Sequence, residues 1–257
     1  MFKKIALVTA LVATASFATW DKFPVLEAGK GQAEIGANYL IQGDATQLGL
    51  FGQARYAVIS NLELGVSVPF VLFTHWDGDD AKMDGLDNIP VMVRYQFMPI
   101  MNAFLDFTIP TASEDLRGKD GPLGFHFGVQ YSQAFGAVNF GSELGLKLET
   151  EGDDKTTPPW DMNLGAEAQF PLGMVTPYVG LDIDMLLGKA TVDGDNVGKS
   201  HTGEMGFFPY VGANIAINQM MYADVSARFG FGGDYLKATV KTDDTPITLT
   251  AKFGINF

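Results

Sequence analysis

Charged side chains recur inside otherwise apolar stretches of this sequence, and they are the residues whose types could do chemistry. They could filter solutes, hold an ion or transfer a proton, depending on which surface they share. The candidates are Arg55, Arg94, Asp106, His126, Glu143, Lys147, Glu167, Asp182, Asp184, Asp224, Arg228 and Lys252. Because most of their immediate neighbours are apolar, the elements that carry them decide which chemistry is available.

Two kinds of site are disfavoured by the residues themselves. A Ser–His hydrolase needs a paired serine and histidine, and His126 is the one histidine that we predict within a strand. The acidic stretches 77–80 and 193–196 approach a calcium loop, but Ala81 and Val197 occupy the next ligand position and the bidentate glutamate is missing. The absence of cysteine excludes thiolate sites. We therefore predict no enzyme activity, no metal and no cofactor.

The elements that position the charges are predicted to be β-strands. In the segment 245–257, Ile247, Leu249 and Phe253 fall on one face, whereas Thr248 and Lys252 fall on the other. Such alternation indicates a strand, because successive side chains of a strand point to opposite faces. Twelve segments show this pattern: 31–42, 47–58, 62–73, 89–97, 101–109, 122–133, 137–148, 160–170, 175–187, 206–217, 220–232 and 245–257.

The links between these segments alternate between short turns and mostly longer polar loops. An even number of strands, with short turns on one rim and long loops on the other, is typical of an outer-membrane barrel. No apolar run after the N-terminus approaches the roughly 20 residues of a membrane helix. We therefore predict an all-β fold, a closed antiparallel up-and-down transmembrane barrel of about twelve strands over residues 31–257.

Alternation by itself does not say which face of the barrel is inside. An exported soluble barrel would bury the apolar face and expose the charges, and this remains an alternative. A ring of aromatic residues near the strand ends favours a membrane, where aromatic side chains line the interfaces. Its members are Tyr39, Tyr56, Phe70, Tyr95, Phe97, Tyr131 and Phe170.

The N-terminal region reads as a signal peptide followed by a short lead. Lys3 and Lys4 precede the apolar run 5–12, and small residues then allow cleavage after Ala18 or Ala15. We expect residues 1–18 to be removed, which changes the net charge from -13 to -15, because two lysines and no acids are lost. Residues 19–30 form a short periplasmic lead, too small for a plug domain but able to tuck into a lumen.

The predicted location is the outer membrane, and it defines the partners. A terminal strand that ends in Phe257 resembles the C-terminal signal of bacterial outer-membrane barrels, which the barrel assembly machinery reads. Outer-membrane lipid and lipopolysaccharide are expected around the barrel, with small-molecule solutes inside it. The acidic excess argues against nucleic acid, which needs a basic surface.

A family resemblance appears in three stretches. Residues 55–66 (RYAVISNLELGV), 85–97 (GLDNIPVMVRYQF) and 105–111 (LDFTIPT) resemble an outer-membrane family that is associated with meta-pathway phenol degradation. Leu86 and Ala112 stand where the family usually has glycine. The resemblance implies a barrel that serves as a channel for small, often aromatic or apolar compounds, and it carries no catalytic residue.

The charged face allows two functional interpretations. Four cationic residues lie on strands close to three acidic ones: Arg55, Arg94, Arg228 and Lys252 near Glu34, Glu63 and Asp224. These charges could form a selective constriction. An ion-pair network is favoured, because buried charges require partners. Asp182, Asp184, Glu143 and Glu167 form an acidic wall opposed only by Lys147, which disfavours anionic solutes. The preferred function is a passive channel for small neutral, cationic or apolar solutes. The alternative is a barrel with a blocked lumen that acts as a structural or surface-interaction protein.

Overall fold

A closed β-barrel is the main feature of the structure, a computed structural model that describes residues 20, 22–76, 83–117, 121–152, 155–196, 200–240 and 242–257. The predicted signal peptide, residues 1–18, lies outside this part of the chain. The twelve long strands among the described residues are β1 (Gly31–Gln42), β2 (Ala45–Ile59), β3 (Leu62–Trp76), β5 (Ile89–Met98), β6 (Met101–Ile109), β7 (Gly124–Phe135), β8 (Val138–Glu149), β10 (Trp160–Gln169), β11 (Val175–Leu187), β14 (Met205–Ala216), β15 (Met221–Phe229) and β16 (Ile247–Asn256).

Each long strand pairs antiparallel with the next one along the chain, and the last strand returns to the first. The closing ladder between β1 and β16 runs from Gln32 opposite Asn256 to Ile41 opposite Ile247. The predicted closed up-and-down barrel is therefore confirmed, with strand ends that differ from the prediction by a few residues. One consequence is a correction, because β3 extends to Trp76 and His75 pairs with Thr46. His126 is thus not the only histidine within a strand.

The apolar face of the barrel points outward. Phe253, Val225 and Leu181 are 41%, 49% and 38% exposed, whereas the neighbouring Lys252, Asp224 and Asp182 are buried. The soluble alternative, with a packed apolar centre, is therefore wrong. Large exposed apolar side chains cover the outer surface, far beyond what a soluble monomer shows. This is the arrangement that lipid requires, and the predicted aromatic residues lie on the same face: Tyr39, Tyr56, Phe70, Tyr95, Phe97 and Phe170 are all exposed.

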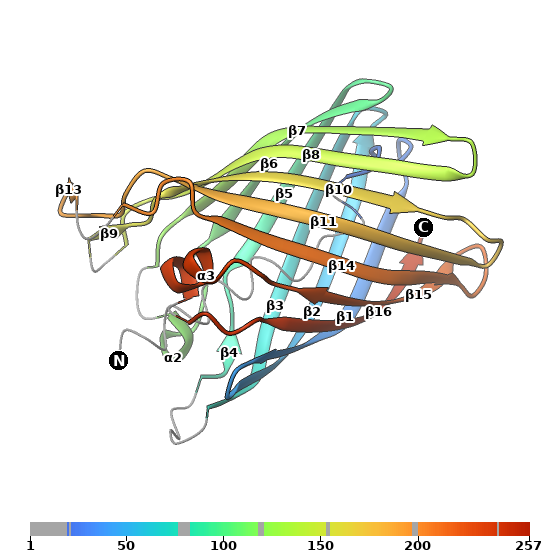
Figure 1. The fold of residues 1–257 in the computed structure, drawn as a ribbon. Helices are drawn as coiled ribbons and strands as arrows, with labels where there is room; N and C mark the ends of the chain where they lie inside the picture. Colours follow the sequence, from blue (N-terminus) through green and yellow to red (C-terminus); the bar gives the residue numbers. More distant parts are fainter. Residues whose placement is uncertain are drawn as a thin grey trace.

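The two rims of the barrel differ as predicted. Short connections such as residues 60–61, 99–100 and 136–137 lie on one rim. The other rim carries the remaining elements, which Figure 1 shows gathered at one end, opposite the C-terminus: β4 (Gly85–Leu86), α2 (Glu114–Arg117), β9 (Thr156–Thr157), β12 (Thr191–Val192), β13 (Asp195–Asn196) and α3 (Gly233–Val240). In the described part of the chain, no helix is both long and apolar enough to cross a bilayer.

The helix α3 was predicted as a polar link, and it is instead packed into the mouth of the barrel. Its Tyr235, Leu236 and Val240 are buried against apolar residues of the strands. These contacts are made with Leu40, Ala45, Leu186 and Phe208. The hydroxyl of Tyr235 donates a hydrogen bond to Asp161 on β10. A second, smaller apolar cluster joins Leu116 of α2 to Val71 and Met83. Both helices therefore narrow the long-loop end of the lumen.

Candidate functional site: the lumen

One group of ion pairs in the lumen lies near the barrel seam, between strands that were predicted from the sequence to be neighbours. Arg55 Nη1 lies 3.3 Å from Glu63 Oε1. Lys252 Nζ lies 3.5 Å from Glu34 Oε2 and 3.8 Å from Asp224 Oδ1. All five side chains are at least nine-tenths buried. Charges this deeply buried require partners, and here each carboxylate lies near a cationic group.

Two of the predicted arginines bind acids that the sequence analysis did not assign to them. Arg94 forms a bidentate salt bridge with Asp106 on β6, in which Nη1 donates to Oδ1 and Nη2 donates to Oδ2 at 3.1 Å. Arg228 on β15 binds Oδ2 of Asp182 on β11. A guanidinium group is a fork of donors on a long side chain, so it can bind a carboxylate with two parallel hydrogen bonds, as Arg94 does, or reach one past the neighbouring strand, as Arg228 does.

The predicted acidic wall is also corrected. Lys147 does bind Asp184, at 2.9 Å, but it is not the only opposing cation. Asp182 is shared between Arg228 and Lys22, whose Nζ lies 2.9 Å from Oδ1. Lys22 precedes the barrel in sequence, so strand order could not place it there. Carboxylates still outnumber cationic side chains on the inward faces of the described strands, where the acids include Glu143, Asp161 and Glu167.

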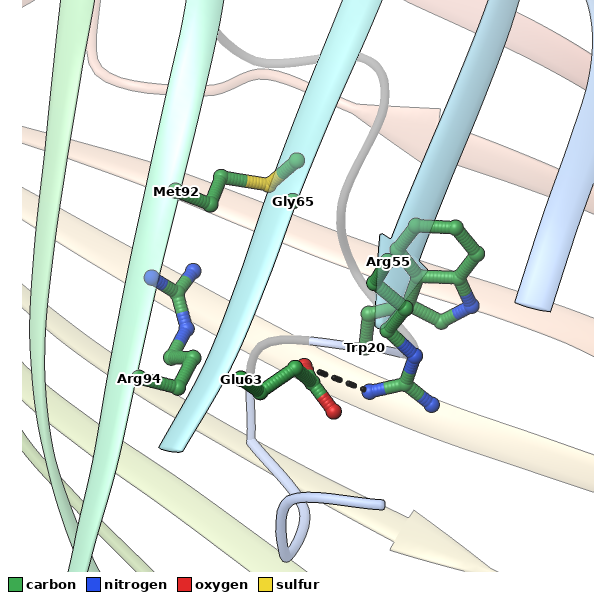
Figure 2. Close-up of a pocket in the computed structure, with 6 residues that line it drawn as sticks. All are labelled: Trp20, Arg55, Glu63, Gly65, Met92 and Arg94. Atoms are coloured by element: carbon green, nitrogen blue, oxygen red, sulfur yellow. Dashed lines mark hydrogen bonds and ion pairs between the residues drawn. The ribbon is translucent and has the colours of Figure 1, made fainter. Parts of the chain in front are cut away.

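The lead enters the lumen. Trp20 is 7% exposed and lies beneath the guanidinium of Arg55, 4.8 Å from the ring centroid (Figure 2). The backbone of the lead is held as well. Asn102 donates to the carbonyl of Phe23 at 3.0 Å, and the amide of Leu26 donates to Glu63 at 2.9 Å. The lead is therefore held against the wall by both its side chains and its backbone.

Little free space remains beside the lead. Trp20, Arg55, Glu63, Gly65, Met92 and Arg94 line a cavity of about 10 Å³, roughly the room for one water molecule (Figure 2). In this cavity the lead and the wall therefore leave room for about one water molecule.

Lys22 occupies a slot in the wall opposite Arg55. A β-carbon at Gly141 would overlap the backbone of Lys22, and one at Gly165 would overlap its side-chain stem, so both glycines make room for it. Burial by itself would lower the pKa of Lys22, but Asp182, Glu143 and Glu167 outweigh that effect and raise the pKa above its ordinary value. Lys22 is thus a buried cation that stays charged.

Three inward tyrosines brace the same side of the barrel. Each ring lies over a glycine of the neighbouring strand, and each hydroxyl donates to a buried carboxylate. The pairs are Tyr178 over Gly212 with Asp224 at 2.9 Å, Tyr210 over Gly180 with Glu167 at 2.9 Å, and Tyr222 over Gly254 with Glu34 at 2.7 Å. These tyrosines were not among the residues predicted from the sequence. The sequence feature that indicates such tyrosines is glycine at alternate, inward-facing positions of the adjacent strands.

His126 lies in a polar cluster on β7, which pairs with β8 beside the Lys22 slot. Its Nδ1 is 3.8 Å from Asp106 Oδ2, its Nε2 is 3.6 Å from Glu143 Oε1, and its ring meets the edge of Phe104. Both distances exceed that of a direct hydrogen bond, so His126 lies near these two carboxylates without a direct hydrogen bond to either. The residues predicted from the sequence as lumen-lining are divided between several ion pairs and polar contacts and are not gathered in one site.

No group of three or more potential ligands in the described residues has the geometry to hold a metal ion. The stretch 77–80 lies outside the described residues. In the stretch 193–196, Asp193 Oδ1 forms an exposed ion pair with Lys155 Nζ.

Comparison with known proteins gives matches only through structure. No family model matches the sequence, and no curated protein matches it. An outer membrane channel from Pseudomonas putida F1 superposes with a TM-score of 0.72 at 13% identity, over 92% of this chain and 98% of that chain. By fold, this chain is an outer-membrane β-barrel.

Two further solved barrels are similar to it. The NanC porin matches this outer-membrane barrel with a TM-score of 0.55 at 8% identity, over 87% of this chain and 98% of the porin. The translocator domain of the autotransporter NalP from Neisseria meningitidis gives a TM-score of 0.52 at 10% identity, over 90% of each chain. The fold that the sequence resemblance implied is therefore confirmed.

Proposed function

We propose that this protein is a passive outer-membrane channel for small neutral, cationic or apolar solutes. The observation that carries the proposal is that the barrel has an apolar exterior and a lumen lined by charged and polar side chains. Inward residues alternate with outward apolar neighbours along the strands, as in the pairs Glu143 and Leu144, Asp184 and Ile183, and Lys252 and Phe253. Side chains of this kind replace part of the hydration shell of a solute, which is how channel linings allow passage. No step of the proposed transport requires bond chemistry, so the proposal includes no enzyme activity.

The lining also supports a preference among solutes. Inward carboxylates outnumber inward cations, and several of them lie on the adjacent strands β8, β10 and β11. A lumen with an acidic excess raises the local concentration of cations and repels anions. We therefore propose that cations and neutral molecules pass more readily than anions.

A second candidate function has its own supporting observation. Trp20 and Lys22 are buried in the lumen, and α3 packs into the long-loop mouth. If neither segment moves, the barrel is blocked and serves as a structural or surface-interaction protein. The same contacts restrict the channel interpretation to small solutes, or to a state in which the lead is displaced.

The test compares residues 19–257 with a variant that lacks residues 19–28, both in planar bilayers and in swelling liposomes. We expect a small conductance from the full chain, a larger one from the variant, and a reversal potential under a KCl gradient that shows K⁺ preferred over Cl⁻. Absence of current and swelling in both proteins would eliminate the channel and leave the blocked barrel.

The location of the protein is part of the proposal. Residues 1–18 would direct export, and the barrel assembly machinery would recognise the strand that ends in Phe257. Phe257 exchanges two backbone hydrogen bonds with Gly31, at 2.8 and 2.9 Å, so it also closes the seam. Lipid and lipopolysaccharide would surround the apolar face. Membrane fractionation of cells that express the chain with and without Phe257 tests this, and we expect less heat-modifiable barrel in the outer membrane without it.

A further inference from the structure

The slot around Lys22 is built from two adjacent rungs of the barrel wall. Four strands contribute one inward residue each to both rungs, because their registers bring these residues opposite one another. The first rung consists of Gly141, Glu167, Gly180 and Tyr210, and the second consists of Glu143, Gly165, Asp182 and Phe208. Glycine therefore alternates with acids and aromatic rings across the wall, which leaves a groove with an acidic end.

The groove fits an unbranched alkyl chain. The stem of Lys22 passes Gly165 so closely that a single methyl group there would overlap its Cε atom. The ammonium group then meets Asp182 Oδ1 at 2.9 Å, with both side chains at least nine-tenths buried. A branched chain at this level has no room beside Gly165, so the shape of the slot discriminates between linear and branched amines.

The end of the slot suits a primary ammonium group. The ring of Tyr210 has its centroid 5.6 Å from Nζ of Lys22, within the range of a cation–π contact. Arg228 also lies near that ring, with its guanidinium carbon 5.7 Å from the centroid, and it binds the second oxygen of Asp182. The arginine fixes the carboxylate in place, and one carboxylate oxygen remains directed at the ammonium group.

We propose that this slot is a binding site for linear primary alkylammonium compounds, and that Lys22 is its resident occupant. The inference deepens the proposed channel function, on which it rests, by naming a solute class. An alkylammonium solute would replace Lys22 one charge for one charge, so the exchange leaves no buried acid without its cation. The displaced lead would then no longer narrow the lumen.

Binding is tested with the Lys22→Ala variant of the full mature chain in detergent micelles. The probe is n-butylammonium chloride, which carries the four carbons and the ammonium group of the lysine side chain, and sodium chloride matches the ionic strength. We expect a saturable rise of a few degrees in the unfolding temperature of the variant and a much smaller rise in the parent, whose slot is filled. The neutral n-butanol and the branched tert-butylammonium ion should have little effect.

Two double variants are the controls. Lys22→Ala with Asp182→Asn removes the carboxylate, and Lys22→Ala with Gly165→Ala fills the groove with a methyl group that also crowds Asp182 Oδ1. Both double variants should lose the rise in unfolding temperature with n-butylammonium. Because the two substitutions disrupt the slot in different ways, a folding defect in one variant leaves the other as a test. An equal response in all three variants, or no response in Lys22→Ala, would overturn the proposal. Binding in micelles needs no ion conduction. The alkylammonium response can therefore be present or absent whether or not the protein conducts current, so this test and the channel test can fail independently.

Discussion

The phenol ring of Tyr210 on β14 lies across Gly180 on β11, its direct partner in register, and its hydroxyl reaches Glu167 one strand further on. A β-carbon at Gly180 would occupy the position of the ring. Tyr178 and Tyr222 repeat this arrangement on neighbouring strands. The wall from β10 round to β1 is thus braced by rings that each span two strands, and it is the wall that holds Lys22.

The bracing predicts a large effect of a small substitution. Gly180→Ala should force the ring of Tyr210 off the wall and strain its bond to Glu167, lowering the free energy of unfolding by about 1–3 kcal/mol. Urea titration in detergent micelles, followed by tryptophan fluorescence, measures this. Gly52→Ala is the matched control, because no atom lies within 4 Å of its β-carbon position, and it should stay within about 0.5 kcal/mol of the parent. Equal costs at the two glycines would contradict the bracing.

The seam pair predicts a contrast between two lysines. Lys252 lies between the buried Glu34 and Asp224, so Lys252→Met should cost about 3–5 kcal/mol of unfolding free energy by leaving two carboxylates without this cation. Lys237 on α3 forms an exposed ion pair with Asp243, which follows the helix, and Lys237→Met should have no measurable effect. The same urea titration compares them. A Lys252→Met protein as stable as the parent would mean that the pair contributes nothing to the barrel.

The packing of α3 predicts a change in conductance. Leu236→Asp places a charge among Leu40, Leu186 and Phe208 and should detach the helix from the mouth, which raises single-channel conductance. Lys237→Asp introduces the same side chain on the exposed face of the same helix and should leave conductance near that of the parent. Conductance that rises equally in both variants would indicate an effect of charge rather than of the helix position.

The anchoring of the lead predicts a defined pH range. The pKa of Lys22 is raised above its ordinary value of 10.5, so its ion pair is fully present below that value and is lost only as the pH rises beyond it. The ratio of conductance between Lys22→Gln and the parent should therefore exceed one and stay constant from pH 7 to 10. Above that range the ratio should fall towards one as the parent loses its anchor. A ratio that falls between pH 7 and 9 would show that Lys22 is not held by acids.

The sequence by itself determined the strands, their order and which side chains share a face. Lys252 and Phe253 had to point to opposite sides of a strand, because the side-chain period of a strand is two. Closure followed from the even number of segments and the sorting of short and long links. These are local properties, repeated along the chain, and each repeat can be read from its own residues.

The tertiary structure decided which side of the strands is inside and which charges meet. Arg94 pairs with Asp106 diagonally on the neighbouring strand, and Asp182 pairs with both Arg228, two strands away, and Lys22 of the lead. These choices depend on the reach of long side chains in the closed barrel, which no local pattern encodes. The helix α3 was not predicted, because an eight-residue segment with three residues to bury resembles a loop until the barrel supplies their partners. The lead became part of the lumen for the same reason, since Trp20 and Lys22 have a binding surface only once the closed wall exists.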